Sequence, residues 1–213
     1  MNTRVTRDSM CSSHNLLRIS LSLIFISTLV HIASASNSTS TKSINNSYKR
    51  FIKVKCNSTT YPSYCYKSLS PYASTIKTNT LTLTKLSIHV ALKAAKNVSL
   101  TLKKLSKAKG NLSHAETELI ADCKENIGDS VDLLQQSADG LKDLNGTSTY
   151  EERFEWDTIK TWMSASITDV GTCSDEFDEL KVRASIQKKI KPAIAHLAWF
   201  NSIALALVNR LSY

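Results

Sequence analysis

Four long stretches of the chain carry apolar residues at alternating steps of three and four positions, and this spacing constrains the fold most strongly. Residues so spaced lie on one face of an α-helix, so each stretch predicts an amphipathic helix with an apolar face to bury. The clearest stripe is the last one, and its members are Ile186, Ile190, Ala193, Leu197, Phe200, Ala204, Leu207 and Leu211. Only five Gly and three Pro occur among 213 residues, too few for the turns of a β-sandwich or barrel.

The three earlier stripes follow one another from about residue 80. The first contains Leu81, Ile88, Ala91, Ala95, Val98, Leu102 and Leu105; the second Ile120, Cys123, Ile127, Val131, Leu134, Ala138 and Leu141; the third Trp156, Ile159, Met163, Val170 and Cys173. Four such helices joined by short connections predict an all-α, up-down-up-down four-helix bundle over residues 80–213.

Capping and turn residues mark where these helices begin and end. Ser113 and Thr149 each precede a Glu by three positions, so we predict capping boxes at the start of the second and third helices. Gly110 and Gly146 are expected to end the first and second helices. We expect Gly171 to loosen the third helix, and Pro192 either kinks the last helix or begins a new one.

Residues 48–76 have the pattern of a small helical hairpin that precedes the bundle. Pro62 suits the first position of a helix, Thr60 stands where a cap is expected, and a third brief turn begins near Pro71. Such short helices are unstable alone, and Cys56 and Cys65 are well spaced to staple them together.

The N-terminus has the three parts of a secretory signal peptide. Basic residues precede a 14-residue apolar run at 19–32, and Ala33-Ser34-Ala35 completes a small-x-small cleavage site. We therefore predict that residues 1–35 are removed between Ala35 and Ser36, with a retained signal anchor as the alternative. No other apolar run is judged long enough to span a membrane, so the secreted protein is expected to be soluble.

Removal of the signal peptide changes the cysteine count and the charge. Cys11 is lost, which leaves four cysteines in an oxidising compartment, and the net charge falls from +9 to +7. Cys123 and Cys173 lie on neighbouring helices and pair naturally, because other pairings would take Cys56 and Cys65 out of their hairpin. We predict the disulfides Cys56–Cys65 and Cys123–Cys173.

Glycosylation signals support secretion. Asn-x-Ser/Thr sequons occur at Asn37 and Asn45 and at the four sites that we expect to be used, which are Asn57, Asn97, Asn111 and Asn145. Residues 36–47 are almost entirely Ser, Thr, Asn and Lys, and we predict that they form a disordered polar tail.

Four separated blocks resemble the plant invertase and pectin methylesterase inhibitor family over residues 48–211. They are Phe51 to Leu69 with both hairpin cysteines, Ala121 to Leu134, Trp162 to Phe177, and Asn201 to Leu207. The resemblance implies a helical hairpin followed by a four-helix bundle. It also implies a secreted, monomeric protein of the plant apoplast or cell wall that binds one carbohydrate-active enzyme and covers its substrate cleft.

Two departures from the invertase-inhibitor pattern favour pectin methylesterase as the target. Residues 146–156 lack the Pro-Lys-Phe element that invertase inhibitors insert, and Thr172 directly precedes Cys173. The resemblance makes Thr172 a candidate partner-binding residue, together with Asn126, Asp129 and Asp132 on the preceding helix. Invertase is the alternative target.

The remaining reactive side chains do not form a catalytic or metal-binding pattern. His89, His114 and His196 flank core positions or begin a helix, and no Glu-x-x-His motif is present, so neither an enzyme nor a cofactor is expected. Lys clusters at 103–109 and 188–191 form either solvated helix faces or a surface for acidic pectin, which makes a non-inhibitory pectin-binding protein a further alternative. Trp156, Trp162 and Trp199 are interpreted as core or seam residues, with sugar stacking as the alternative. Nucleic acid is not an expected partner.

Overall fold

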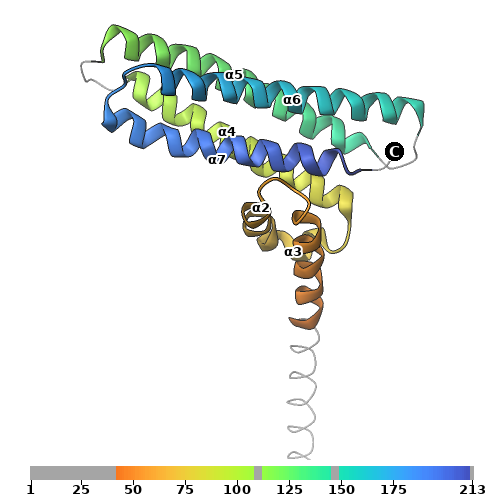
Figure 1. Cartoon of the computed structure of the whole chain (residues 1–213). Coiled ribbons are helices and arrows are strands. Elements are labelled where there is room, and N and C mark those ends of the chain that lie inside the picture. The colour runs from red at the N-terminus through yellow and green to blue at the C-terminus, as the bar shows by residue number, and fades with distance from the viewer. Residues whose placement is uncertain (1–41, 108–111, 145–148, 212–213) are drawn as a thin grey trace, which may run out of the picture. The chain divides into compact units, whose positions relative to one another are not determined.

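The computed structural model describes residues 42–107, 112–144 and 149–211. Residues 42–56 are helical. Three short elements follow, which are α2 (Pro62–Leu69), the 3-10 turn η1 (Ser70–Tyr72) and α3 (Ala73–Ile76), and then the first long helix, α4 (Thr80–Lys107). The chain continues with α5 (His114–Asp143), α6 (Tyr150–Glu179) and α7 (Ala184–Val208) (Figure 1). Residues 48–213 form one compact unit, which holds the hairpin and the bundle.

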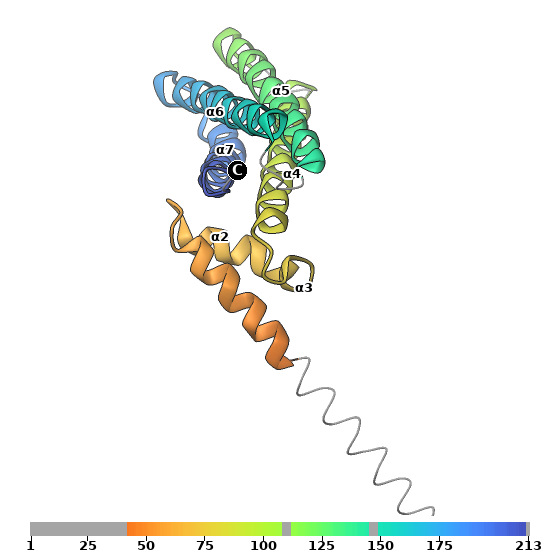
Figure 2. The ribbon, with the colours of Figure 1, turned by 90° about the vertical axis from the view of Figure 1, so that its right-hand side faces the viewer.

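The four long helices form the predicted up-down-up-down bundle. The helix pairs in contact are α4 with α5, α5 with α6, α6 with α7, and α7 with α4, so each helix touches two neighbours around a square. The view along the bundle shows α5 and α6 on the side away from the hairpin, with α4 and α7 next to it (Figure 2). The α5–α6 edge and the α4–α7 edge therefore lie on opposite sides of the bundle.

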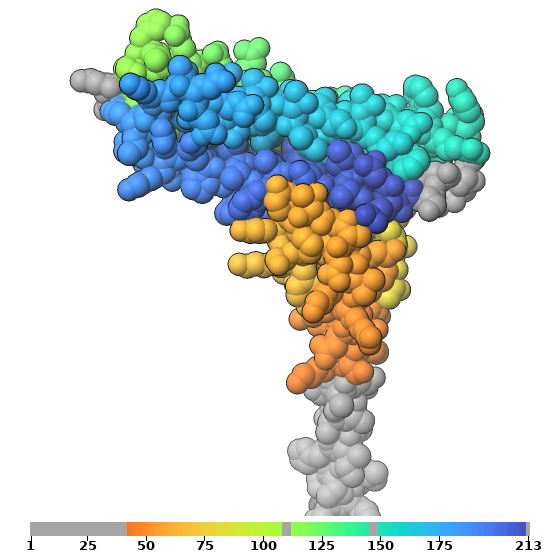
Figure 3. Space-filling model, viewed as in Figure 1, coloured from red at the N-terminus to blue at the C-terminus, as the bar shows by residue number. Residues whose placement is uncertain are grey.

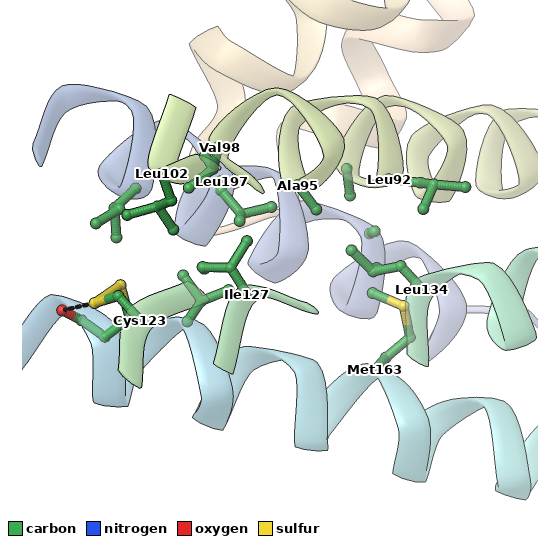
Figure 4. Close-up of a cluster of buried hydrophobic side chains, with 14 of the residues drawn as sticks. Leu92, Ala95, Val98, Leu102, Cys123, Ile127, Leu134, Met163 and Leu197 are labelled. Atoms are coloured by element: carbon green, nitrogen blue, oxygen red, sulfur yellow. Dashed lines mark hydrogen bonds between the residues drawn. A yellow bond between two sulfur atoms is a disulfide. The ribbon is translucent and has the colours of Figure 1, made fainter. Parts of the chain in front are cut away.

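The bundle core contains residues from all four helices. Figure 4 shows Leu92, Ile127, Met163 and Leu197 pointing into the shared interior, and all four side chains are buried. Most members of the predicted stripes are buried. Those that lie at the margin and are only partly buried are Leu81, Val131, Ala138, Trp156, Ala193 and Phe200. Burying this apolar surface drives the assembly of helices whose faces would otherwise contact water.

Helix ends confirm one predicted capping box in full. The Ser113 hydroxyl accepts from the Glu116 N–H at 3.1 Å, and the Ser113 N–H donates to Glu116 Oε2 at 3.0 Å. Thr149 accepts from the Glu152 N–H at 3.2 Å at the start of α6. Gly110 and Gly146 lie outside the described residues.

The structure bears on the two interruptions predicted in the long helices. α7 runs from Ala184 to Val208 with exposed Pro192 inside it, so no new helix begins there, and a kink at Pro192 stays a prediction. α6 likewise continues through Gly171 to Glu179, and a Cβ atom at Gly171 would meet nothing within 4 Å. Gly171 thus occupies an ordinary helical position on the surface and does not loosen the helix.

The hairpin packs on the bundle through its own small core. Cys56 and Cys65 form a disulfide, and both are buried with Ile52, Leu69, Ile76, Leu83, Ile203 and Leu207. The Arg210 guanidinium donates to the Ser58 carbonyl at 2.7 Å and joins the end of α7 to the hairpin loop. Figure 3 shows the hairpin, in gold, directly against the dark-blue end of α7. The N-cap of α2 is Tyr61 and not Thr60, and Pro62 begins the helix as predicted.

Three sequence predictions about the termini and membranes have different outcomes. Residues 42–47 are helical and do not belong to a disordered tail, because the helix that carries Cys56 begins before the hairpin core. The predicted signal peptide, its cleavage site at Ala35 and Ser36, and residues 36–41 lie outside the described residues. By length and composition alone, α7 is apolar enough to cross a membrane, contrary to our prediction, although its apolar residues Ile190, Leu197 and Leu207 are buried in the two cores.

Candidate functional site

The surface between α5 and α6 is organised by two contacts that set the register of these antiparallel helices. Cys123 and Cys173 form a disulfide with Cα atoms 4.7 Å apart, and the hydroxyls of Ser130 and Ser166 lie 2.7 Å apart. In this arrangement Asp122 lies near Glu176 and Asp129 lies near Asp169, and positions 126 and 172 fall between these two pairs along their helices. Sequence motifs far apart in the chain therefore meet along one line.

We call this line the acidic seam and define it by six residues. They are Asp122, Asn126 and Asp129 from α5, and Asp169, Thr172 and Glu176 from α6. The side chains are exposed or half-buried, and Glu176 Oε2 lies 3.7 Å from the sulfur of Cys123. Asp132, which was predicted with this group, is exposed about 60° further round α5, at the edge of the acidic seam.

The acidic seam holds negative charge that no nearby cation compensates. Burial raises the pKa of Asp169, and the neighbouring charge of Asp129 raises it further. Burial likewise raises the pKa of Glu176, with smaller contributions from Asp122 and Glu179. Within the described ranges, none of the four acidic residues of the seam forms an ion pair.

One carboxylate oxygen of the acidic seam is orphaned. Asp169 Oδ2 is buried without a hydrogen-bond partner among the described residues. Buried polar atoms are normally satisfied, and an exception of this kind indicates a functional constraint or a missing partner. A cation brought by another molecule would relieve the repulsion between Asp129 and Asp169.

Thr172 lies midway along the α6 side of the acidic seam. It is exposed on α6, and its hydroxyl donates to the Thr168 carbonyl at 3.1 Å, which leaves its oxygen free to accept a hydrogen bond. The same register carries the surface onward to Leu133, Ala165 and Trp162, which are half-buried. These half-buried apolar residues border the acidic seam, and Trp is among the residues enriched at protein interfaces.

Other motif residues have structural roles in the core. Asn201 on α7 is fully buried, and its amide donates to Ser166 Oγ at 2.9 Å, which in turn contacts Ser130. The indole N–H of half-buried Trp156 donates to the Val208 carbonyl at 3.1 Å. Glu116 is 3 % exposed and binds Arg183 through both carboxylate oxygens, at 2.8 and 3.0 Å.

The parts of the chain that the structure describes contain no candidate metal site. No group of three or more His, Cys, Asp or Glu side chains there is arranged to hold a metal ion. His89, His114 and His196 are exposed on three different helices. The disulfides Cys56–Cys65 and Cys123–Cys173 are confirmed, so these cysteines provide no thiolate.

The sequence predictions missed Asp169 and Glu176. Both are half-buried, and both belong to the acidic seam only because the α5–α6 register brings them opposite Asp129 and Asp122. The distribution of acidic residues along the sequence could have indicated an acidic surface on these two helices. All seventeen acidic residues that follow residue 35 lie between 116 and 179, the span of α5 and α6.

Two of the predicted glycosylation sites fall on described residues. Asn57 and Asn97 are exposed, as an occupied sequon requires, whereas Asn111 and Asn145 lie outside the described residues. Use of these sites remains a prediction.

The fold and the candidate site together define a helical, disulfide-linked bundle that presents a surface for binding. The sequence model described as plant invertase/pectin methylesterase inhibitor matches residues 50–207. The chain belongs to this family, and the resemblance found in the sequence is confirmed.

Individual relatives agree with this assignment. The chain is 39 % identical over 166 residues to Pectinesterase inhibitor 4 of Arabidopsis thaliana, covering 76 % of this chain and 82 % of the relative. It is 34 % identical over 190 residues to the 21 kDa protein of Daucus carota, covering 89 % of this chain and 94 % of the relative. A crystal structure of a mutant pectin methylesterase inhibitor from Arabidopsis has the same fold, with a TM-score of 0.59 and 18 % identity over 74 % of this chain and 94 % of that one.

Proposed function

We propose that the protein is a secreted inhibitor of pectin methylesterase that binds the enzyme one-to-one through the acidic seam and blocks its substrate cleft. Membership of the inhibitor family and relatives named as pectinesterase inhibitors support this target. Inhibition by occlusion needs a rigid surface and no reactive group, and two disulfides and a buried core provide that rigidity. The protein itself would catalyse nothing.

The observation that carries the proposal is the unpaired carboxylate of Asp169 beside Asp129. Both acids lack an ion-pair partner among the described residues, and one oxygen of Asp169 is buried and unsatisfied. A basic side chain of the enzyme that lay along the acidic seam would neutralise the charge that Asp129 and Asp169 share. Complementary charge of this kind speeds encounter and selects partners. Thr172 and Asn126 would add hydrogen bonds at the centre, with Asp132 at the rim.

Titration of two enzymes tests the target. Increasing amounts of the purified secreted protein are added to a fixed amount of pectin methylesterase, and separately to invertase. We expect methylesterase activity to fall to its endpoint at one equivalent, as a monomeric inhibitor requires, and invertase activity to stay constant. Inhibition of invertase alone would support the alternative target. Loss of neither activity, with retention on polygalacturonate, would support a pectin-binding protein and contradict the proposal.

Secretion to the apoplast or cell wall is part of the same proposal. The basic N-terminus, the apolar run and the Ala-x-Ala site support secretion. The two disulfides suit an oxidising compartment. N-terminal sequencing of the protein recovered from the extracellular fluid tests it. We expect the first residue to be Ser36, and recovery of the intact N-terminus on membranes would indicate a retained anchor.

A further inference from the structure

A hollow lies where the hairpin meets the bundle, away from the acidic seam. Its volume is about 380 Å³, and it is lined by Tyr64, Lys67 and Ser68 from α2 and by His196 and Phe200 from α7. This volume falls within the range of small-ligand sites, roughly 300–1,000 Å³. The acidic seam lies on the opposite, α5–α6 edge of the bundle (Figure 2), so a ligand in this hollow would leave that edge free.

Aromatic rings gather at the rim of the hollow. The ring centroid of Tyr64 lies 4.3 Å from that of Trp199 and 6.0 Å from that of His196, and Tyr61 lies 5.7 Å from Trp199. Tyr64 remains 39 % exposed, so part of its ring faces solvent. Exposed, rigid aromatic rings stack well against the C–H faces of pyranose sugars, because these faces are flat and apolar while the sugar hydroxyls point outward.

The polar groups around the hollow are available to a ligand. The Lys67 ammonium, the Tyr64 hydroxyl and the His196 imidazole form no hydrogen bond or ion pair with any other residue in the described ranges. The Ser68 hydroxyl is used, since it donates to the Cys65 carbonyl at 3.1 Å. An apolar hollow with a few convergent, unpaired polar groups is the usual arrangement of a binding site.

The positive charge of the elements around the hollow favours an anionic ligand. Residues 36–115 and 180–213, which include the hairpin, α4 and α7, contain no Asp or Glu at all. They contain twenty Lys and Arg residues, among them Lys67 in the hollow. A carboxylate ligand would therefore meet only positive charge on these elements, and its attraction would not be offset by a neighbouring acid.

We propose that this hollow binds a uronic acid residue of an acidic glycan, with its pyranose ring on the aromatic rim and its carboxylate on Lys67. De-esterified pectin is a glycan of this class. Its selection as the natural ligand rests on the proposed function, because pectin methylesterase converts methyl esters into these carboxylates. The preference of the hollow for a uronate does not rest on it. The protein would then hold the enzyme on one edge and its polyanionic product near the other.

Calorimetric titration with three sugars of equal length tests the proposal. The probes are trigalacturonic acid, its trimethyl ester and the neutral trisaccharide maltotriose. We expect one molecule of the acid to bind per protein, with the ester at least about tenfold weaker and no detectable binding of maltotriose. Absence of binding by trigalacturonic acid, or equal binding of the acid and the ester, would overturn the proposal.

Matched variants distinguish the hollow from diffuse attraction to surface lysines. Lys67→Gln should weaken binding of the acid about two- to fivefold, in keeping with the loss of one exposed ion pair, and Tyr64→Ala about tenfold. Lys103→Gln and Lys188→Gln make the same charge change at exposed positions outside the hollow and should leave binding unchanged. Equal weakening by all three lysine variants would overturn the proposal.

Two further measurements separate folding and inhibition from sugar binding. Tyr64→Phe keeps the ring and should retain binding within about twofold, and thermal melting should show that the Tyr64→Ala variant is folded. Lys67→Gln and Tyr64→Ala should inhibit pectin methylesterase as the unaltered protein does. If the unaltered protein bound trigalacturonic acid but failed to inhibit the enzyme, the proposed function would fail and the uronate site would stand.

Discussion

Glu116 at the start of α5 binds Arg183 at the start of α7 with both of its carboxylate oxygens, at 2.8 and 3.0 Å. The same carboxylate closes the capping box with Ser113 and accepts the backbone N–H of Arg183 at 3.0 Å. Arg183 is the N-cap residue of α7, so one buried side chain fixes the first turns of two helices. Arg183 lies 67 residues from Glu116 in sequence, which makes this a long-range contact at one end of the bundle.

We predict that Glu116→Gln lowers the melting temperature at neutral pH and flattens its dependence on acid. The hydrogen bond from Arg183 and the other donors lower the pKa of Glu116 from 4.5 to about 2. The folded state therefore binds fewer protons than the unfolded state between these values. The stability from this carboxylate is complete above about pH 4.5 and is lost as the pH falls toward 2.

Glu118→Gln is the control for this prediction, since Glu118 is exposed in the same turn of α5. Thermal melting of both variants between pH 2 and 7 provides the comparison. Equal melting curves for the two variants would show that the contact with Arg183 contributes nothing.

Two replacements of Asn201 should lower the free energy of unfolding by different amounts, because one removes a hydrogen bond and the other introduces a buried charge. Asn201 Oδ1 has no partner among the described residues, and Ser166 keeps Ser130 as a partner when the Asn201 amide is removed. Asn201→Leu should therefore cost no more than about 2 kcal/mol of unfolding free energy. Asn201→Asp should cost about 3 kcal/mol or more, because it buries an unpaired carboxylate. Urea denaturation followed by circular dichroism measures both, and the reverse order would contradict the assigned roles.

The two disulfides should contribute unequally to stability. Cys123–Cys173 closes a loop with a sequence separation of 50, and Cys56–Cys65 one of 9. In the loop-entropy description, removal of the longer link costs about 4 kcal/mol and of the shorter about 3 kcal/mol at 25 °C. Denaturation of the paired Cys→Ala variants tests this order. A larger loss from the hairpin variant would mean that packing around Cys56 and Cys65 outweighs chain entropy.

The ionised acidic seam should destabilise the folded protein when no partner is bound. The pKa of Asp169 is raised in the folded state, so folding holds its proton more tightly and the ionised form is unfavourable at neutral pH. We predict that Asp169→Asn raises the melting temperature at pH 7 and that this gain disappears below the ordinary aspartate value of 3.8. The same variant should inhibit pectin methylesterase less well. A lower melting temperature at pH 7 would show that the carboxylate is satisfied in the folded protein.

Periodicity was sufficient to predict the bundle because each helix signals its own buried face. Ile127, Met163 and Leu197 could be placed in the core from spacing alone, and the structure confirms them. The boundary of the hairpin core could not be predicted this way. Leu83 and Leu207 belong to long helices, yet they are buried against the hairpin, and their period does not show which neighbour covers them.

The candidate sites required information about tertiary structure. Thr172 and Asn126 came from the family resemblance, whereas Asp169 becomes a neighbour of Asp129 only through the register set by the disulfide and the Ser130–Ser166 contact. Tyr64 and Trp199 are 135 residues apart and meet only when the hairpin docks on α7. Local sequence carries no record of such distant contacts.

Inhibition of pectin methylesterase by Thr172→Arg measures the central claim most directly. An Arg at this exposed position would extend into the acidic seam, occupy the place of an incoming cation and neutralise its carboxylates. Thr117→Arg is the matched control, because Thr117 is exposed on α5 about 180° round the helix from Asn126, and its hydroxyl also donates to the preceding turn, at 3.0 Å to the Ser113 carbonyl.

The inhibition constants of the two variants are compared with that of the unaltered protein, after circular dichroism shows equal helicity. We predict that Thr172→Arg weakens inhibition about tenfold or more and that Thr117→Arg leaves it unchanged. Undiminished inhibition by Thr172→Arg, or equal weakening by both variants, would contradict the assignment of the acidic seam as the enzyme-binding surface.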